Sequence, residues 1–202
     1  MSASVPERLV RASELTTMPV VSAASGEDLA EVRDVVFDPT GHALVGFTLN
    51  KRGWLSGRRK ERLPATAVTA IGRDAVIVAT DDALVERDDA PVELAAPASN
   101  RVVLGDRVLT DGGTDLGVVV DVVVRVGRSA EVEFEVVGYE VGGEAVESVT
   151  GGQRAFVPID AQQAVSGTDL VVPAAARDFI RQDLTGFGGA VDGYREHLRG
   201  GS

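Results

Sequence analysis

The chain has 202 residues, a formal net charge of −11 at pH 7 and no cysteine. The absence of cysteine excludes disulfides, thiolate nucleophiles and cysteine-based metal sites. The negative charge argues against general nucleic-acid binding, because phosphates are neutralised by clustered lysine and arginine.

Valine dominates the apolar residues and aromatic residues are few, which is typical of small packed β units. Arginine greatly outnumbers lysine, which occurs only at Lys51 and Lys60; this codon bias favours a bacterial source. The first residues show no basic flank followed by an apolar stretch. The longest apolar run, from Leu116 to Val124, is interrupted by Asp121 and is too short to span a bilayer. We therefore expect an acidic, cytoplasmic protein without a membrane span.

A strand-and-turn phrase occurs twice along the chain. The first copy reads VSAASGEDLAEVRDVVFD, from Val21 to Asp38, and the second reads VLTDGGTDLGVVVDVVVR, from Val108 to Arg125. Shorter matches follow in the same order: Val45–Phe47 with Val137–Tyr139, and Leu63–Pro64 with Val157–Pro158. Because repeats determine architecture before local propensity does, the sequence predicts a duplicated unit.

Each copy carries short strand patterns separated by turns. Residues 43–50 alternate, with Ala43, Val45, Phe47 and Leu49 on one face. The SGED, DPTGH and DGGTD segments have the glycine, proline and aspartate chemistry of tight turns. About five to six short strands per copy predict a small antiparallel barrel.

The predicted organisation has four parts. Residues 8–86 form the first repeat, and residues 87–100, rich in proline, alanine and acidic residues, form a linker. Residues 101–175 form the second repeat, and residues 176–199 form a helical tail. Within the tail, the TGFGG segment is expected to break the helix. The tail is expected to pack on a barrel or to cover an exposed edge, with partner binding as the alternative.

The quoted segments resemble the PRC-barrel family. The first copy carries ASEL, GEDLAEVRDVVFD, VGF, RLP and DAVIV in the family's order, with Ala30 where the family usually has glycine. The second copy is similar through LGDRVLTDGGTDLGVVVDVVV, VVGYEV and FVPIDAQQAVSGTDLVVP. The resemblance implies a mainly β fold: two tandem small antiparallel β-barrels, PRC-barrel-like, with short C-terminal helices.

The same family is similar to the cytoplasmic domain of the photosynthetic reaction-centre H subunit and to the C-terminal domain of a ribosome maturation factor. Both are protein-contact roles, so the resemblance implies protein binding. A reaction-centre role would be inherited from the fold alone, and function is determined by the site rather than by the fold.

The sequence offers no set of residues typical of catalysis or metal binding. His42 and His197 have no second ligand at helical or strand spacing. Asp111 and Asp115 lack the further oxygen ligands of a calcium loop. Asp34 and Asp121 occupy matching places, where a carboxylate accepting backbone hydrogen bonds at a strand irregularity is favoured over a catalytic pair. We expect no catalytic residue, cofactor or metal.

One segment reverses the overall charge. The expected contact residues on this basic hairpin are Lys51, Arg52, Trp54, Arg58, Arg59, Lys60 and Arg62. Its six cations exceed its one acid, Glu61, by five charges. The equivalent segment of the second copy carries Glu144 and Glu147 and is interpreted as a hairpin of opposite charge bias.

The basic hairpin has more than one interpretation. It could be a solvated edge whose cations block strand addition. As a contact surface, it could pair with the acidic segment within or between chains, bind an acidic protein, or bind RNA or anionic lipid. Arginine and tryptophan often carry interface energy, and steering by such a surface weakens with salt.

We therefore predict a non-enzymatic protein-binding or adaptor module whose contact surface is the basic hairpin. A protein partner is expected, a homo-oligomer is possible, and nucleic acid is not the expected partner. The alternative is an RNA- or ribosome-assembly-associated factor. An enzyme or small-molecule binder would need a pocket with converging polar groups, of which the sequence gives no sign.

Overall fold

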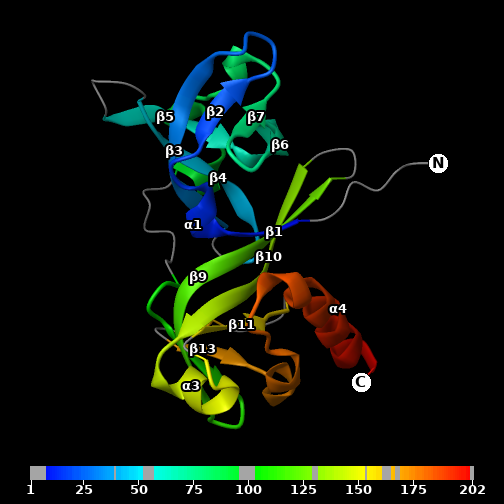
Figure 1. Ribbon diagram of the computed structural model, residues 1–202. Helices are drawn as coiled ribbons and strands as arrows, with labels where there is room; N and C mark the ends of the chain where they lie inside the picture. The colour runs from blue at the N-terminus through cyan, green and yellow to red at the C-terminus, as the bar shows by residue number, and fades with distance from the viewer. Residues whose placement is uncertain are drawn as a thin grey trace, which may run out of the picture. The chain divides into compact units, whose positions relative to one another are not determined.

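The computed structural model describes residues 8–38, 40–51, 57–95, 103–128, 132–152, 154–160, 165–166 and 169–200. The chain is mainly β, with two sheets and few helices (Figure 1). It divides into two compact units, residues 1–101 with 124–135, and residues 102–123 with 136–202.

The first unit is built on a six-stranded sheet with the strand order β5-β4-β3-β2-β7-β6. Its strands are β2 (Pro19–Ser22), β3 (Asp28–Phe37), β4 (Leu44–Asn50), β5 (Arg58–Pro64), β6 (Val68–Ile71) and β7 (Val76–Val78). Its remaining elements are β1 (Arg8–Arg11), α1 (Ala12–Leu15), α2 (Val92–Ala95) and the 3-10 helices η1 (Ala65–Ala67), η2 (Asp81–Ala83) and η3 (Arg87–Asp89).

The second sheet has the strand order β11-β10-β9-β8-β13-β12, and β1 pairs with β9. Its strands are β8 (Arg107–Thr110), β9 (Asp115–Arg128), β10 (Val132–Gly142), β11 (Arg154–Pro158), β12 (Val165–Ser166) and β13 (Asp169–Val172). The helices that follow are α3 (Glu144–Thr150), η4 (Ala174–Phe179) and α4 (Leu184–Gly200).

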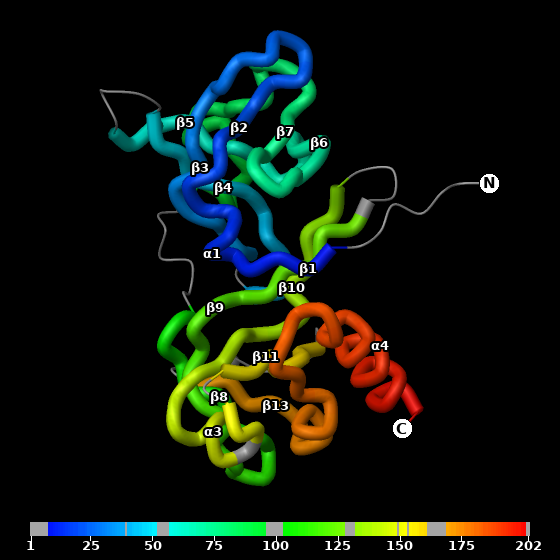
Figure 2. The backbone as a smooth tube through the Cα atoms, in the orientation of Figure 1, coloured from blue at the N-terminus to red at the C-terminus, as the bar shows by residue number. Residues whose placement is uncertain are grey.

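The two sheets share one topology. Each strand of the first corresponds to the strand six places later in the second, and each sheet has one parallel pair, β2–β7 and β8–β13. Figure 2 labels the strands of these two pairs along the backbone tube. In these pairs Val20 lies opposite Val76, and Val108 lies opposite Leu170. The structure thus matches Val20, not Val21, to Val108, because the first turn is one residue longer than the second.

The strand pairing leaves both sheets open among the described residues. The paths end at β5 and β6 in one sheet and at β11 and β12 in the other. The prediction of a mainly β chain is confirmed, whereas a closed barrel is not found in the described pairing. No helix in the described ranges is long and apolar enough to cross a membrane.

A glycine at the same place in each sheet admits a residue from a following helix. Gly46 and Gly138 lie opposite Pro64 and Pro158 in their respective sheets. A Cβ at Gly46 would lie 2.8 Å from a Leu94 methyl group, and one at Gly138 would lie 2.5 Å from the Phe187 ring. Leu94 of α2 and Phe187 of α4 are both fully buried. Each sheet is therefore covered by a helix that follows it in sequence.

The predicted turns and strand irregularities are present. Gly26 and Gly113 have φ of 73° and 79°, a left-handed conformation that favours glycine in tight turns. Asp34 accepts a hydrogen bond from the Val35 N–H at 2.9 Å, where the β3–β4 register shifts. Asp121 accepts the equivalent bond from the Val122 N–H at 2.8 Å. Each of the two carboxylates therefore accepts a backbone hydrogen bond, as predicted.

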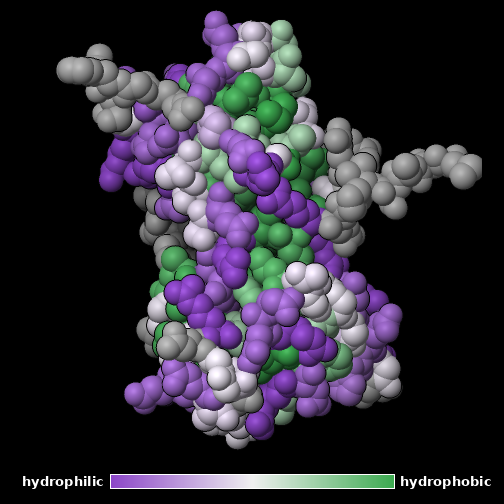
Figure 3. Space-filling view, viewed as in Figure 1, coloured by the Kyte–Doolittle hydropathy of each residue, from purple (hydrophilic) through white to green (hydrophobic). Residues whose placement is uncertain are grey.

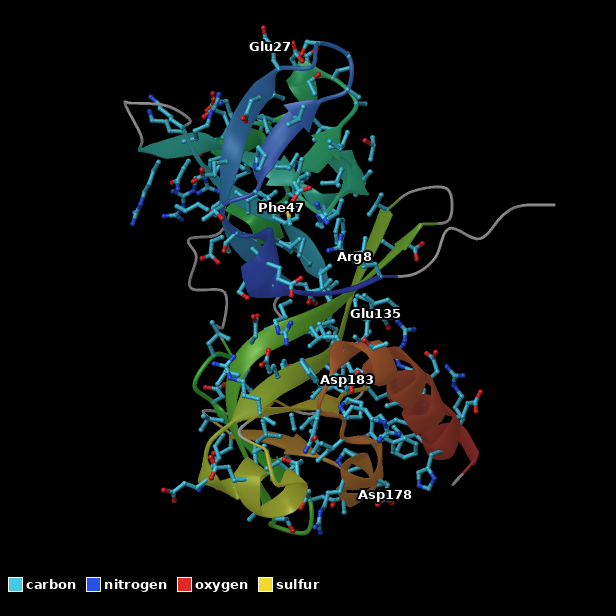
Figure 4. The ribbon with its side chains drawn as sticks, in the orientation of Figure 1. Arg8, Glu27, Phe47, Glu135, Asp178 and Asp183 are labelled. Atoms are coloured by element: carbon cyan, nitrogen blue, oxygen red, sulfur yellow. The ribbon has the colours of Figure 1, made fainter. Side chains whose placement is uncertain are left out.

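The prediction that TGFGG breaks the helical tail is wrong, because α4 runs continuously through it. The Asp183 carboxylate accepts a hydrogen bond from the Gly186 N–H at 2.9 Å and caps the first turn (Figure 4). Each glycine disfavours the helix by about 1 kcal/mol relative to alanine, and burial of the Phe187 side chain offsets this cost. The stretch before it is the 3-10 helix η4 and not an α-helix.

Residues 124–135, the far end of the β9–β10 pair, group with the first unit. Within that unit Phe47 packs edge-to-face on Phe134, with ring centroids 6.1 Å apart, and Ala43 pairs with Glu135 in an isolated bridge. The predicted boundaries at residues 86, 100 and 175 stay predictions.

Candidate functional site

The basic segment identified in the sequence forms strand β5 at one end of its sheet path. Arg62 lies opposite Thr48 and Arg58 lies opposite Asn50, with a register shift between them. Arg58 and Lys60 are exposed, and so is Lys51, whose N–H donates to the Gly57 carbonyl at 2.7 Å. Nitrogen-tipped side chains project around β5 at the left of Figure 4. We call Lys51, Arg58, Arg59, Lys60 and Arg62 the β5 surface.

Arg59 is the most firmly held cation of the β5 surface. Its guanidinium donates to the Leu29 carbonyl and to the Glu61 carboxylate, the latter at 2.7 Å. Both partners of the Arg59–Glu61 pair are 25% exposed. The Arg59 hydrogen bond, supported by backbone N–H groups, lowers the pKa of Glu61 from its ordinary 4.5 to about 2.

Replacing Glu61 by glutamine is expected to lower the free energy of unfolding by about 1 kcal/mol at pH 7. Because the folded-state pKa is depressed, this stability is present above pH 4.5 and is lost as the pH falls toward 2. Urea unfolding of both proteins between pH 7 and pH 3 measures the difference. The exposed Asp74→Asn variant should show no such gap. A gap independent of pH would contradict the assignment.

Arg62 on β5 and Arg33 on β3 lie on the two strands that flank β4, which carries Thr48. The Arg33 Nε donates to the Thr48 hydroxyl at 3.2 Å. The Arg62 backbone exchanges two hydrogen bonds with Val85, at 2.7 and 2.9 Å. Burial, followed by the charges of Arg87 and Arg33, lowers the pKa of Arg62. The three guanidinium groups therefore repel one another in a partly desolvated place.

A cavity of about 490 Å³ opens beside these arginines. Its cationic lining residues are Arg33, Arg58, Arg59, Lys60, Arg62 and Arg87. Glu86 and Asp88 also line it, which leaves four positive charges in excess, and the uncharged lining residues are Thr48 and Leu49. We call this cavity the cationic pocket. In Figure 3 the surface beside the grey atoms at upper left, over β5, is hydrophilic.

The structure brings four of the predicted contact residues together in the cationic pocket: Arg58, Arg59, Lys60 and Arg62. Arg52 and Trp54 lie outside the described residues. The sequence reasoning missed Arg33 and Arg87. Arg33 could have been found from strand alternation, because it follows the buried Val32. Arg87 gave no comparable signal in its acidic segment.

The acidic counterpart is not a hairpin. Glu144 and Glu147 are exposed on helix α3, which begins after Gly143 and ends at Thr150. The helix separates β10 from β11, where the first unit has the connection between β4 and β5. The prediction of two corresponding hairpins of opposite charge is therefore wrong, although the opposite charges are present.

Among the described residues, no group of three or more histidine, cysteine, aspartate or glutamate side chains could hold a metal ion. The backbone N–H of His42 donates a hydrogen bond to the Asp38 carboxylate at 2.8 Å. The His197 ring packs on Phe179 with centroids 5.9 Å apart. The chemistry that the first unit offers is the binding of anions by the guanidinium and ammonium groups of the cationic pocket.

Comparison with known protein families finds a match that lies in the first unit. Residues 7–85 match the family model of the PRC-barrel domain. The predicted resemblance is therefore confirmed over the first copy. No curated protein matches the chain.

Proposed function

We propose that the chain is a non-enzymatic adaptor that binds an acidic protein partner through the β5 surface. The observation that carries this proposal is the concentration of four cations on one seven-residue strand in a chain of net charge −11. Such a patch attracts an acidic partner and orients it before contact.

We further propose that the chain consists of two tandem PRC-type β-barrels, each with its own covering helix. The family match over residues 7–85 supports this for the first. The shared strand order, the parallel pair in each sheet and the equivalent glycines Gly46 and Gly138 support it for the second. The strands β5 and β11 occupy equivalent ends of the two sheets. The cationic cluster is found only in β5, which reads RRKERLP, whereas β11 reads RAFVP.

The double variant Arg58→Glu/Lys60→Glu is expected to weaken binding of an acidic probe at least about tenfold. Both side chains are exposed, so the thermal melt should not change. The probe is a fluorescent 20-residue polyglutamate, followed by anisotropy at low and at physiological salt. Wild-type affinity should fall as salt rises.

Arg73→Glu is the matched control, because Arg73 is an exposed arginine of the same unit that lies outside β5. Equal affinities for the wild type and the β5 variant would contradict the proposal. Tighter, salt-dependent binding of a ribosomal RNA fragment than of polyglutamate would favour the RNA-associated alternative instead.

A third variant separates contact from edge protection. Arg58→Glu/Lys60→Glu keeps the edge charged, whereas Arg58→Ser/Lys60→Ser removes the charge that blocks strand addition. If β5 only protects an edge, the serine variant aggregates and the glutamate variant behaves as wild type in every assay. If β5 binds a partner, both variants lose the probe.

A further inference from the structure

The cationic pocket contains more positive charge than its own residues neutralise. Its six cations face two lining carboxylates. One of the arginines, Arg59, is bonded to Glu61, yet the pocket still keeps four other guanidinium groups. Like charges held this close destabilise one another unless an anion lies between them.

Two hydrogen-bond donors of the pocket arginines have no acceptor in the described part of the fold. The Nε atoms of Arg59 and Arg62 are buried and have no hydrogen-bond partner in the described structure. A buried donor without a partner costs about 1–3 kcal/mol, and native structures rarely retain one. The fold therefore leaves the polar groups of these two pocket arginines incompletely satisfied.

The size and lining of the pocket restrict the class of ligand. A volume of about 490 Å³ falls in the range of small-molecule sites, roughly 300–1,000 Å³. Leu49 supplies its apolar lining, and no aromatic ring is among the described lining residues. The pocket therefore suits a compact, highly charged and hydrophilic ligand. Planar guanidinium forks match the oxygens of phosphate groups in particular.

We propose that the cationic pocket is a binding site for a short oligophosphate, a chain of two or more linked phosphate groups. Arg33, Arg62 and Arg87 donate to its oxygens from β3, β5 and η3, and Lys60 adds charge at the rim. This ligand class goes beyond the proposed binding of an acidic protein and depends on residues outside the β5 surface.

The test uses inorganic tripolyphosphate with the full chain, followed by isothermal titration calorimetry and thermal melting. The wild type should bind one tripolyphosphate and melt about 5 °C higher or more in a hundredfold excess over Kd. Sulfate, with a single anionic centre, should bind at least about tenfold more weakly. Equal affinity for sulfate and tripolyphosphate, or no binding of either, would overturn the proposal.

Arg33→Gln and Arg87→Gln are expected to lower tripolyphosphate affinity at least about tenfold, while Arg73→Gln leaves it unchanged. Because Arg33 bonds Thr48 and Arg87 bonds the Ala95 carbonyl at 2.9 Å, melting without ligand checks that each variant folds. The exposed Lys60→Gln variant provides a change with no packing role and should also weaken binding. Unchanged affinity in all three would overturn the assignment.

The two proposals can fail separately. Arg87 lies outside the β5 surface, so the Arg87→Gln variant should lose affinity for tripolyphosphate and keep its affinity for polyglutamate. If polyglutamate does not bind the wild type but tripolyphosphate does, the protein-binding proposal fails and the oligophosphate site stands. If polyglutamate binds and tripolyphosphate does not, the oligophosphate site is wrong.

Discussion

Replacing Phe187 by alanine is expected to lower the free energy of unfolding by about 3–5 kcal/mol. Phe187 is fully buried and packs on Phe156 with ring centroids 5.5 Å apart. Its ring occupies the space that a side chain at Gly138 would otherwise fill. Because Gly138 has no side chain that could fill the gap, the truncation leaves a cavity between α4 and the sheet.

Guanidinium unfolding followed by circular dichroism measures this loss. Leu198→Ala is the matched control on the same helix, because Leu198 is only half-buried and should cost about 1 kcal/mol. Amide hydrogen exchange should quicken in β11, which α4 contacts. A Phe187→Ala effect no larger than that of Leu198→Ala would show that α4 does not seal the sheet.

The Gly46→Ala variant is expected to lower the free energy of unfolding by about 3 kcal/mol. The added Cβ would lie 2.5 Å from the Leu63 carbonyl oxygen and 2.8 and 2.9 Å from the Leu94 methyl groups. Leu94 can move away at the end of its side chain. The Leu63 carbonyl cannot, because it belongs to the paired strand β5.

Thermal and guanidinium unfolding of Gly46→Ala test this clash. Gly57→Ala is the control, since no heavy atom lies within 4 Å of its added Cβ. When Leu94→Ala is combined with Gly46→Ala, the combined loss should be less than the sum of the two single losses, because the Leu94 contact is removed while the carbonyl contact remains. A Gly46→Ala variant as stable as Gly57→Ala would contradict the close helix–sheet contact.

The sequence predicted the repeat because the matched residues are those that fold a strand and turn. Val32 and Val119 match and are both buried. Asp34 and Asp121 match and both bond the next backbone N–H. The one-residue error at Val21 arose in the turn, where a single insertion leaves the alternating apolar pattern unchanged.

The helical parts were predicted poorly, because tertiary burial decides them. Three glycines flank Phe187 in the TGFGG segment, and local propensity alone would break the helix there. The buried side chains of Phe187, Val191 and Tyr194 keep α4 in place. Leu94 gave no signal as a core residue within a segment interpreted as linker, yet it is fully buried.

The candidate site was half predictable. The cations of β5 adjoin one another in the sequence, so their charge was visible without a structure. Arg33 and Arg87 lie 25 or more residues away in the sequence and reach the same cavity only through the sheet register and η3. A pocket assembled from separate strands has no sequence motif, which is why no sequence pattern indicated this pocket.

Backbone chemical-shift mapping of the ¹⁵N-labelled full chain tests the central claim most directly. Polyglutamate of 20 residues is titrated in at low salt, and amide shifts are followed. The β5 surface predicts changes at Lys51 and across residues 57–62, with none on the acidic helix α3. Shifts confined to α3 or α4, or no shifts at a probe concentration of about 1 mM, where even weak binding registers, would contradict it.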